Sequence, residues 1–215
     1  GKEFMIPLFQ HYPRLSDKLP HVPLGDFPTP VKPLEKLGAS LDISKLFMKC
    51  DNISGRIYGG NKIRKLEFLL GRAVARDYRE VLTYGAAGSN HALATALYAA
   101  KLGLGCISVL GPQPNAGAIG KNLLAGYRAD ADLRYYGNYR AFPAATRRIV
   151  VERKNKTGRF PMIIPVGGTT PLGTAGFVNA GLELAGQIKS GEIGKPDFIY
   201  VAMGSMGTAV GIALG

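Results

Sequence analysis

The chain has 215 residues, of which 46% are hydrophobic and 20% charged. This composition is typical of a globular protein with a substantial core, and it excludes an intrinsically disordered chain. The formal net charge is +12, but Lys and Arg are spread along the chain. A solvated basic surface is therefore favoured over a dedicated nucleic-acid-binding face.

Cysteine content and hydropathy indicate the setting of the protein. Its two cysteines, Cys50 and Cys106, are too few for a disulfide framework, which favours a reducing compartment. No apolar run reaches the roughly 18–20 residues that span a bilayer, and the proline-broken N-terminus lacks a signal-peptide core. We therefore expect a cytoplasmic protein with no membrane partner.

Short apolar runs alternate with helical patterns along most of the chain, which predicts an α/β fold with a parallel sheet and helices on its faces. Residues 1–44 are rich in proline and are expected to wrap a surface irregularly. The chain ends inside a predicted helix, from which we expect a fragment whose C-terminal part is missing. The predicted strands are 45–50, 81–84, 106–110, 133–136, 162–166 and 198–203, and the predicted helices are 61–78, 90–102, 119–127, 144–156, 174–189 and one that begins after Thr208.

The loop after the last predicted strand has the composition of an anion site. It reads Gly204, Ser205, Met206, Gly207 and Thr208, and a helix follows it. Small residues let backbone N–H groups approach a phosphate, and the helix N-terminus adds the positive end of its dipole. The loop matches neither a Walker motif nor a dinucleotide fingerprint. On local features alone, a glycine-rich turn without a ligand is an equally good interpretation.

A lysine at the start of a predicted helix is the second candidate. Lys62 follows the pair Gly59–Gly60, and Asn61 is the expected helix cap. A cation is unfavourable at a helix N-terminus, so the amine loses its proton more easily and becomes a candidate for Schiff-base chemistry. A solvated surface lysine is the more ordinary interpretation.

The third candidate is the turn Gly88–His91 between a strand and a helix. Ser89 or Asn90 is suited either to cap that helix or to bind a substrate carboxylate beside the helix N–H groups. His91 is either a base or a buried structural histidine. Since His11 and His21 have no cysteines or carboxylates clustered around them, we expect no metal site.

Four segments together resemble one enzyme family. They are GGNKIRKLEFLL, YGAAGSNHALATALYAAKLGL, VGGTTPLGTAGFVNAGLEL and VAMGSMGTAVGIALG. In this order they are similar to the 1-aminocyclopropane-1-carboxylate deaminase and D-cysteine desulfhydrase family, and the similarity extends from about Pro28 to the end of the chain. The resemblance implies the tryptophan synthase β-like fold, which is fold type II of the pyridoxal phosphate enzymes.

The resemblance also implies roles for individual residues. Lys62 would form the Schiff base with pyridoxal 5′-phosphate and move the substrate proton. Asn90 would bind the phenolic oxygen of the cofactor, and Ser89, Asn90 and His91 would bind the substrate, with Ser89 assisting proton transfer. The loop Gly204–Thr208, Met206 included, would bind the phosphate.

Departures from the family pattern bear on the substrate. His91 stands where the deaminases usually have glutamine, which is more like the desulfhydrase branch. Residues 92–94 lack the arginine common there, and Lys49 and Cys50 precede Asp51 in place of the usual Arg-Glu. In the family, the residue that pairs with the pyridine nitrogen of the cofactor lies in the C-terminal part of the chain. No residue of this sequence is assigned to that role.

The resemblance implies two domains and a small amino-acid substrate. Residues 1–74 and 164–215 would form parts of a large cofactor-binding domain, and 75–163 a small α/β domain, in a homodimer. The first expectation is elimination from D-cysteine to give pyruvate, ammonia and sulfide. The alternative is 1-aminocyclopropane-1-carboxylate deamination to 2-oxobutanoate and ammonia. Interpretations of another class are an inactive cofactor-binding protein and a basic nucleic-acid-binding protein.

Overall fold

A four-stranded parallel sheet forms one half of the computed structural model, which describes residues 5–114, 117 and 119–215. The order is β5-β4-β3-β6, and every neighbouring pair is parallel. The predicted parallel sheet is therefore confirmed. Its strands are β3 (Glu80–Ala86), β4 (Gly105–Gly111), β5 (Asp132–Tyr135) and β6 (Met162–Ile164).

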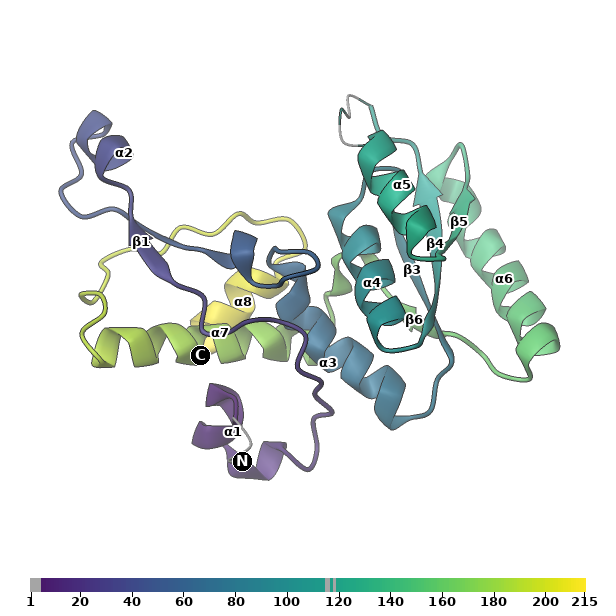
Figure 1. The fold of residues 1–215 in the computed structure, drawn as a ribbon, viewed down its shortest axis with the longest axis horizontal. Helices are drawn as coiled ribbons and strands as arrows, with labels where there is room; N and C mark the ends of the chain where they lie inside the picture. The colour runs from purple at the N-terminus through teal and green to yellow at the C-terminus, as the bar shows by residue number, and fades with distance from the viewer. Residues whose placement is uncertain (1–4, 115–116, 118) are drawn as a thin grey trace.

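Helices cover both faces of this sheet (Figure 1). The chain moves from β3 to β4 to β5 and then crosses back to β6 on the other side of β3. Because such crossovers are right-handed, this reversal moves the last connecting helix to the opposite face. Accordingly α4 (Asn90–Lys101) and α5 (Ile119–Arg128) lie on one face, and α6 (Phe142–Thr157) lies on the other.

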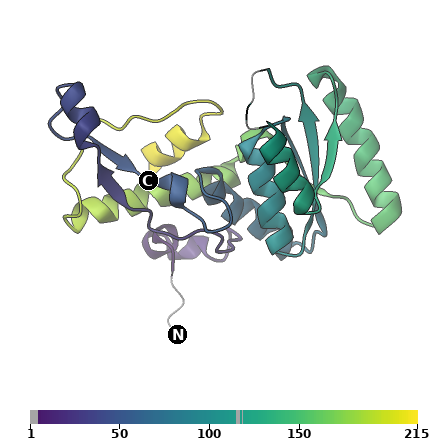
Figure 2. The ribbon, with the colours of Figure 1, turned by 45° about the horizontal axis from the view of Figure 1, so that its top comes forward.

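The other half of the molecule consists mainly of helices. A long helix, α7, runs along it, with α8 packed on one side and the N-terminal helix α1 on the other (Figures 1 and 2). Its elements are α1 (Pro7–His11), η1 (Pro13–Leu15), β1 (Val31–Pro33), α2 (Glu35–Ser40), β2 (Phe47–Lys49), η2 (Asp51–Ile53), η4 (Val166–Gly168), α7 (Pro171–Lys189) and α8 (Gly207–Leu214); the short η3 (Tyr139–Ala141) belongs to the sheet half.

The helix α3 (Lys62–Ala75) lies between the two halves, and its residues 63–71 are all buried. It crosses α7 at Gly176, where a Cβ atom would come within 2.0 Å of the carbonyl oxygen of Arg64. Only glycine lets the two backbones approach this closely. The position of α3 is therefore fixed by direct backbone contact.

Buried charges tie α3 to segments far away in the sequence. The guanidinium of Arg64 donates to Asp51 at 2.8 Å, to Glu183 of α7 at 3.0 Å and to the hydroxyl of Thr29 at 3.0 Å. Burial opposes its charge, but the hydrogen bonds to Asp51 and Glu183 raise the pKa of Arg64. Lys49 adds a second cation, 2.6 Å from Glu183.

The N-terminal segment is held by Glu67, the one acidic residue of α3. The carboxylate of Glu67 accepts from the backbone N–H groups of Leu24 and Gly25, and it contacts the ring of His21 at 3.2 Å. The segment predicted to wrap a surface is therefore anchored in the core, and it contributes β1, which the sequence did not predict.

The strand predicted at 198–203 is wrong, because the structure has no strand there. A strand needs a neighbour to pair with its backbone groups, and no other strand of the described residues pairs with this segment. Its large side chains are exposed, with Phe198 at 77% and Tyr200 at 83%.

The predicted cap of α3 is also wrong. Asn61 makes no side-chain cap hydrogen bond, and its backbone is already helical. Its side-chain oxygen instead accepts from the Nζ atom of Lys62 at 3.2 Å. The amide is thus engaged by the neighbouring lysine and not by the helix backbone.

The sheet and its helices span residues 80–164, and we propose that the small domain runs from residue 75 to residue 163. A search of the described residues finds no helix of the length and hydropathy that a membrane span requires.

We predict that Arg64→Met lowers the free energy of unfolding by about 3–5 kcal/mol, because it leaves the buried Glu183 and the partly buried Asp51 without the cation that they share. Urea denaturation measures this change. The matched control is Arg56→Met, which removes an ion pair to Asp26 whose arginine is 89% exposed and which should cost less than about 1 kcal/mol. Equal losses in the two variants would contradict the structural role of Arg64.

Candidate active site

The three loops singled out in the sequence converge around the N-terminal end of α3. The hydroxyl of Tyr58, four residues before Lys62, donates to Asn90 at 2.9 Å. Lys65, one turn into α3, is the nearest group to a Cβ atom built on Gly207, at 3.0 Å. The lysine segment therefore contacts both of the other predicted loops.

Lys62 occupies the first position of α3, as the sequence predicted. It is half-buried, and burial lowers the pKa of its amine from the ordinary value of 10.5. Its Nζ atom donates to Asn61, a neutral amide, at 3.2 Å. No carboxylate among the described residues forms an ion pair with it. The amine is therefore easier to deprotonate than a surface lysine.

A second lysine, which the sequence analysis missed, lies on the same side of the helix. Lys65 is 1% exposed, and its Nζ atom donates to the hydroxyl of Thr169 at 2.8 Å and to the carbonyl of Gly167 at 3.2 Å. Burial, and then the charge of Lys62, lower the pKa of Lys65 to about 8. Its position three residues after Lys62 was the available signal, since such residues share a helix face.

The loop before α8 supplies hydroxyl and backbone donors next to Lys65. The hydroxyl of Ser205 lies 2.6 Å from that of Thr169, which itself accepts from Lys65. Met206 adopts a left-handed conformation with φ of 63°, and no side chain caps the helix that follows. A cation, two hydroxyls and an uncapped helix N-terminus together suit a phosphate group.

The remaining loop residues contribute less. Gly204 is exposed, with no atom within 4 Å of its Cβ position, and Gly207 is buried. Thr208 is partly buried, and its side chain makes no hydrogen bond to the described residues. Only Ser205 and Gly207 thus contact the lysine side of the site.

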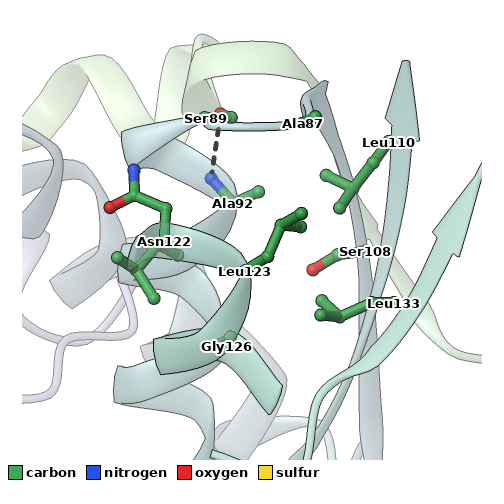
Figure 3. Close-up of a pocket in the computed structure, with 11 residues that line it drawn as sticks. Ala87, Ser89, Ala92, Ser108, Leu110, Asn122, Leu123, Gly126 and Leu133 are labelled. Carbon is green, nitrogen blue, oxygen red and sulfur yellow. Dashed lines mark hydrogen bonds between the residues drawn. The ribbon is translucent and has the colours of Figure 1, made fainter. Parts of the chain in front are cut away.

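Ser89 caps α4, as one interpretation of the sequence predicted. Its Oγ atom accepts from the backbone N–H of Ala92 at 3.2 Å (Figure 3). Because Oγ serves as the acceptor in this bond, its own proton remains free to donate. The cap therefore leaves Ser89 able to bind an anion at the same helix end.

His91 is a buried neutral imidazole. It is 5% exposed, and its Nε2 atom lies 3.0 Å from the hydroxyl of Thr83. Burial, and then the charges of Lys62 and Lys65, lower the pKa of His91 to about 4. It lies beside η4, where a Cβ atom built on Gly168 would come 3.3 Å from the Cε1 atom of His91.

Two cavities are lined in part by these residues. One of about 10 Å³ lies between α4, α5 and the sheet beside Ser89, and it is too small for more than a water molecule (Figure 3). The other, about 560 Å³, is lined by Thr169, Ser205 and Gly207 together with mostly apolar residues of α1, α7 and α8. Its lining holds no charged residue.

Comparison with known proteins gives consistent results. A family model described as "Pyridoxal-phosphate dependent enzyme" matches residues 22–215. A putative 1-aminocyclopropane-1-carboxylate deaminase from Pyrococcus horikoshii is 39% identical over 94% of this chain and 60% of its own length. A D-cysteine desulfhydrase from Salmonella paratyphi B is 36% identical over 92% of this chain and 60% of its own length. The chain therefore spans about 60% of these relatives.

Solved structures show the same similarity. A crystal structure of a homologue of 1-aminocyclopropane-1-carboxylate deaminase superposes with a TM-score of 0.81 and 37% identity, over 97% of this chain and 61% of that one. Threonine deaminase isoform 2 from Solanum lycopersicum, at 21% identity and a TM-score of 0.68, shares the fold. The predicted fold class and family resemblance are confirmed.

The low pKa of His91 predicts a specific loss of stability in acid. The unfolded chain binds a proton at this residue below about pH 6.5, whereas the folded protein does so only near pH 4. The free energy of unfolding therefore falls as the pH drops between these values.

In His91→Gln the proton-binding contribution of His91 is absent. Between neutral pH and pH 5, the free energy of unfolding of the wild-type protein should therefore fall by on the order of 1–2 kcal/mol more than that of the variant. Urea denaturation at the two pH values measures the difference. Parallel losses in the two proteins would show that folded His91 titrates normally.

Proposed function

Because the chain belongs to the pyridoxal-phosphate dependent enzyme family, we propose that it binds this cofactor at Lys62 and acts on a small amino acid. The observation that carries the proposal is the pair Lys62 and Lys65, which lie one turn apart with pKa values lowered by burial. The amine of Lys62 has no ionic partner in the described residues, and that of Lys65 is held by hydroxyl and carbonyl oxygens beside the loop before α8.

The residues of the site suit the parts of the cofactor. Lys65, the hydroxyls of Thr169 and Ser205 and the N-terminus of α8 are donors that suit its phosphate. Lys62 supplies the amine that condenses with its aldehyde. The amide of Asn90 suits its phenolic oxygen. Each part of the cofactor thus has a donor of matching chemistry in one region of the chain.

When bound, pyridoxal phosphate supplies an electron sink for a carbanion formed on an amino acid. Lys62, whose pKa is lowered by burial, takes and returns the substrate proton at Nζ. The free hydroxyl proton of Ser89 and the N-terminus of α4 bind the substrate carboxylate. His91 is neutral at physiological pH, so it adds no charge to that subsite.

We propose elimination from D-cysteine as the leading activity. It converts D-cysteine and water into pyruvate, ammonia and hydrogen sulfide. The support is the Ser89-Asn90-His91 sequence and the similarity to a D-cysteine desulfhydrase. The alternative is conversion of 1-aminocyclopropane-1-carboxylate and water into 2-oxobutanoate and ammonia, supported by the similarity to relatives named for that reaction. A cytoplasmic homodimer, which the resemblance implies, completes the proposal.

Product analysis tests this choice. The protein carrying this chain, loaded with pyridoxal phosphate, is incubated with D-cysteine, L-cysteine or 1-aminocyclopropane-1-carboxylate, and sulfide, pyruvate and 2-oxobutanoate are measured. We expect sulfide and pyruvate from D-cysteine, and at least about a hundredfold less of both from Lys62→Ala. 2-Oxobutanoate as the main product would favour the alternative, and bound cofactor without any product would contradict both reactions.

A further inference from the structure

We propose that Tyr58 and Asn122 are positioning residues, which orient the side-chain amide of Asn90 so that its NH2 group faces the bound cofactor. This inference rests on the proposed function, because the ligand that Asn90 meets is taken to be pyridoxal phosphate. It assigns roles to two residues that the sequence analysis did not single out.

Two donors converge on the oxygen of Asn90. The hydroxyl of Tyr58 donates to Oδ1 at 2.9 Å, and the Nδ2 atom of Asn122 donates to the same oxygen at 3.0 Å. A carbonyl oxygen has two lone pairs, so both are now used. The NH2 group of Asn90 has no partner among the described residues, and the residue is exposed.

The orientation of Asn90 follows from the backbone carbonyl of Gly88, which can only accept a hydrogen bond. Asn122 also donates Nδ2 to the backbone carbonyl of Gly88 at 2.8 Å. If the Asn122 amide were reversed, its oxygen would face that carbonyl and both hydrogen bonds would be lost. Asn122 therefore presents a nitrogen to Asn90, which in turn must present its oxygen. The network fixes both amides without reference to any ligand.

Each positioning residue is itself held in place. Asn122 lies on α5 and is buried, with its amide nitrogen turned toward the start of α4 (Figure 3). The carbonyl of Tyr58 accepts from the fully buried Tyr98 at 2.8 Å. Burial raises the pKa of the Tyr58 phenol, which keeps it protonated as a donor. The two donors therefore approach Asn90 from separate, fixed elements.

As a consequence, Asn90 selects for a ligand atom that accepts a hydrogen bond. With its oxygen satisfied, Asn90 can only donate, so the group opposite must be an oxygen with free lone pairs, and an anionic oxygen is preferred. The phenolic oxygen of pyridoxal phosphate has this chemistry. A rotated Asn90 would present its own oxygen to that anion and repel it.

The test measures cofactor binding by absorbance titration. Tyr58→Phe removes one donor and should weaken pyridoxal phosphate binding about three- to tenfold. Asn122→Asp keeps the shape but replaces the donor with an acceptor, so it should weaken binding more. The matched control is Tyr84→Phe, which loses a hydroxyl contact to Thr146 on the sheet half and should bind as wild type does.

A double-mutant cycle separates positioning from general structural support. In an Asn90→Ala background, Tyr58→Phe should change binding less than about twofold, because the amide it orients is gone. An equal loss in both backgrounds would overturn the inference while leaving the proposed function intact.

Hydrogen exchange of side-chain amides, measured by NMR, gives a readout that needs no activity. Without cofactor the NH2 protons of Asn122 should be protected and those of Asn90 should exchange freely, and pyridoxal phosphate should protect Asn90. Protected Asn90 protons in the free protein, or unprotected ones in the complex, would overturn the inference. If the wild-type protein did not bind pyridoxal phosphate at all, both the proposed function and this inference would be wrong.

Discussion

The buried charges of α3 fix this helix against segments that lie far away in the sequence. Arg64 and Glu67 point to one side, where they hold Asp51, Glu183 and the N-terminal segment. Lys62 and Lys65 lie on the opposite side, since successive residues rotate by about 100° around a helix. The ion pairs of one side fix the helix, and the amines of the other side are therefore fixed as well.

This division explains why two lysines in one turn can have different roles. Lys65 is surrounded by fixed oxygen acceptors and lies against Gly207, where any side chain would crowd it. These contacts hold the Nζ atom of Lys65 in place, which suits the binding of an anion beside it. Among the described residues, the Nζ atom of Lys62 hydrogen-bonds only to the neutral amide of Asn61. We therefore propose that the hydrogen-bonded Lys65 binds an anion and that Lys62, whose pKa is lowered by burial, is the nucleophile.

The sequence predicted what depends on local pattern. The alternation of strands and helices, the cap at Ser89 and the position of Lys62 all follow from periodicity and from residue preferences within a few positions. It could not predict Thr169 as a partner of Lys65, or Tyr58 and Asn122 as partners of Asn90, because these contacts join segments that are distant in the chain. The strand expected at 198–203 failed for a related reason: an apolar run becomes a strand only when another strand pairs with it.

We propose that Lys62, and not Lys65, bonds covalently to the cofactor. Borohydride reduction of the protein loaded with pyridoxal phosphate, followed by peptide mapping, tests it directly, because reduction makes the lysine–cofactor bond permanent. We expect a pyridoxyl group on Lys62, with Lys65 unmodified. A label on Lys65, or no label on either lysine, would contradict it.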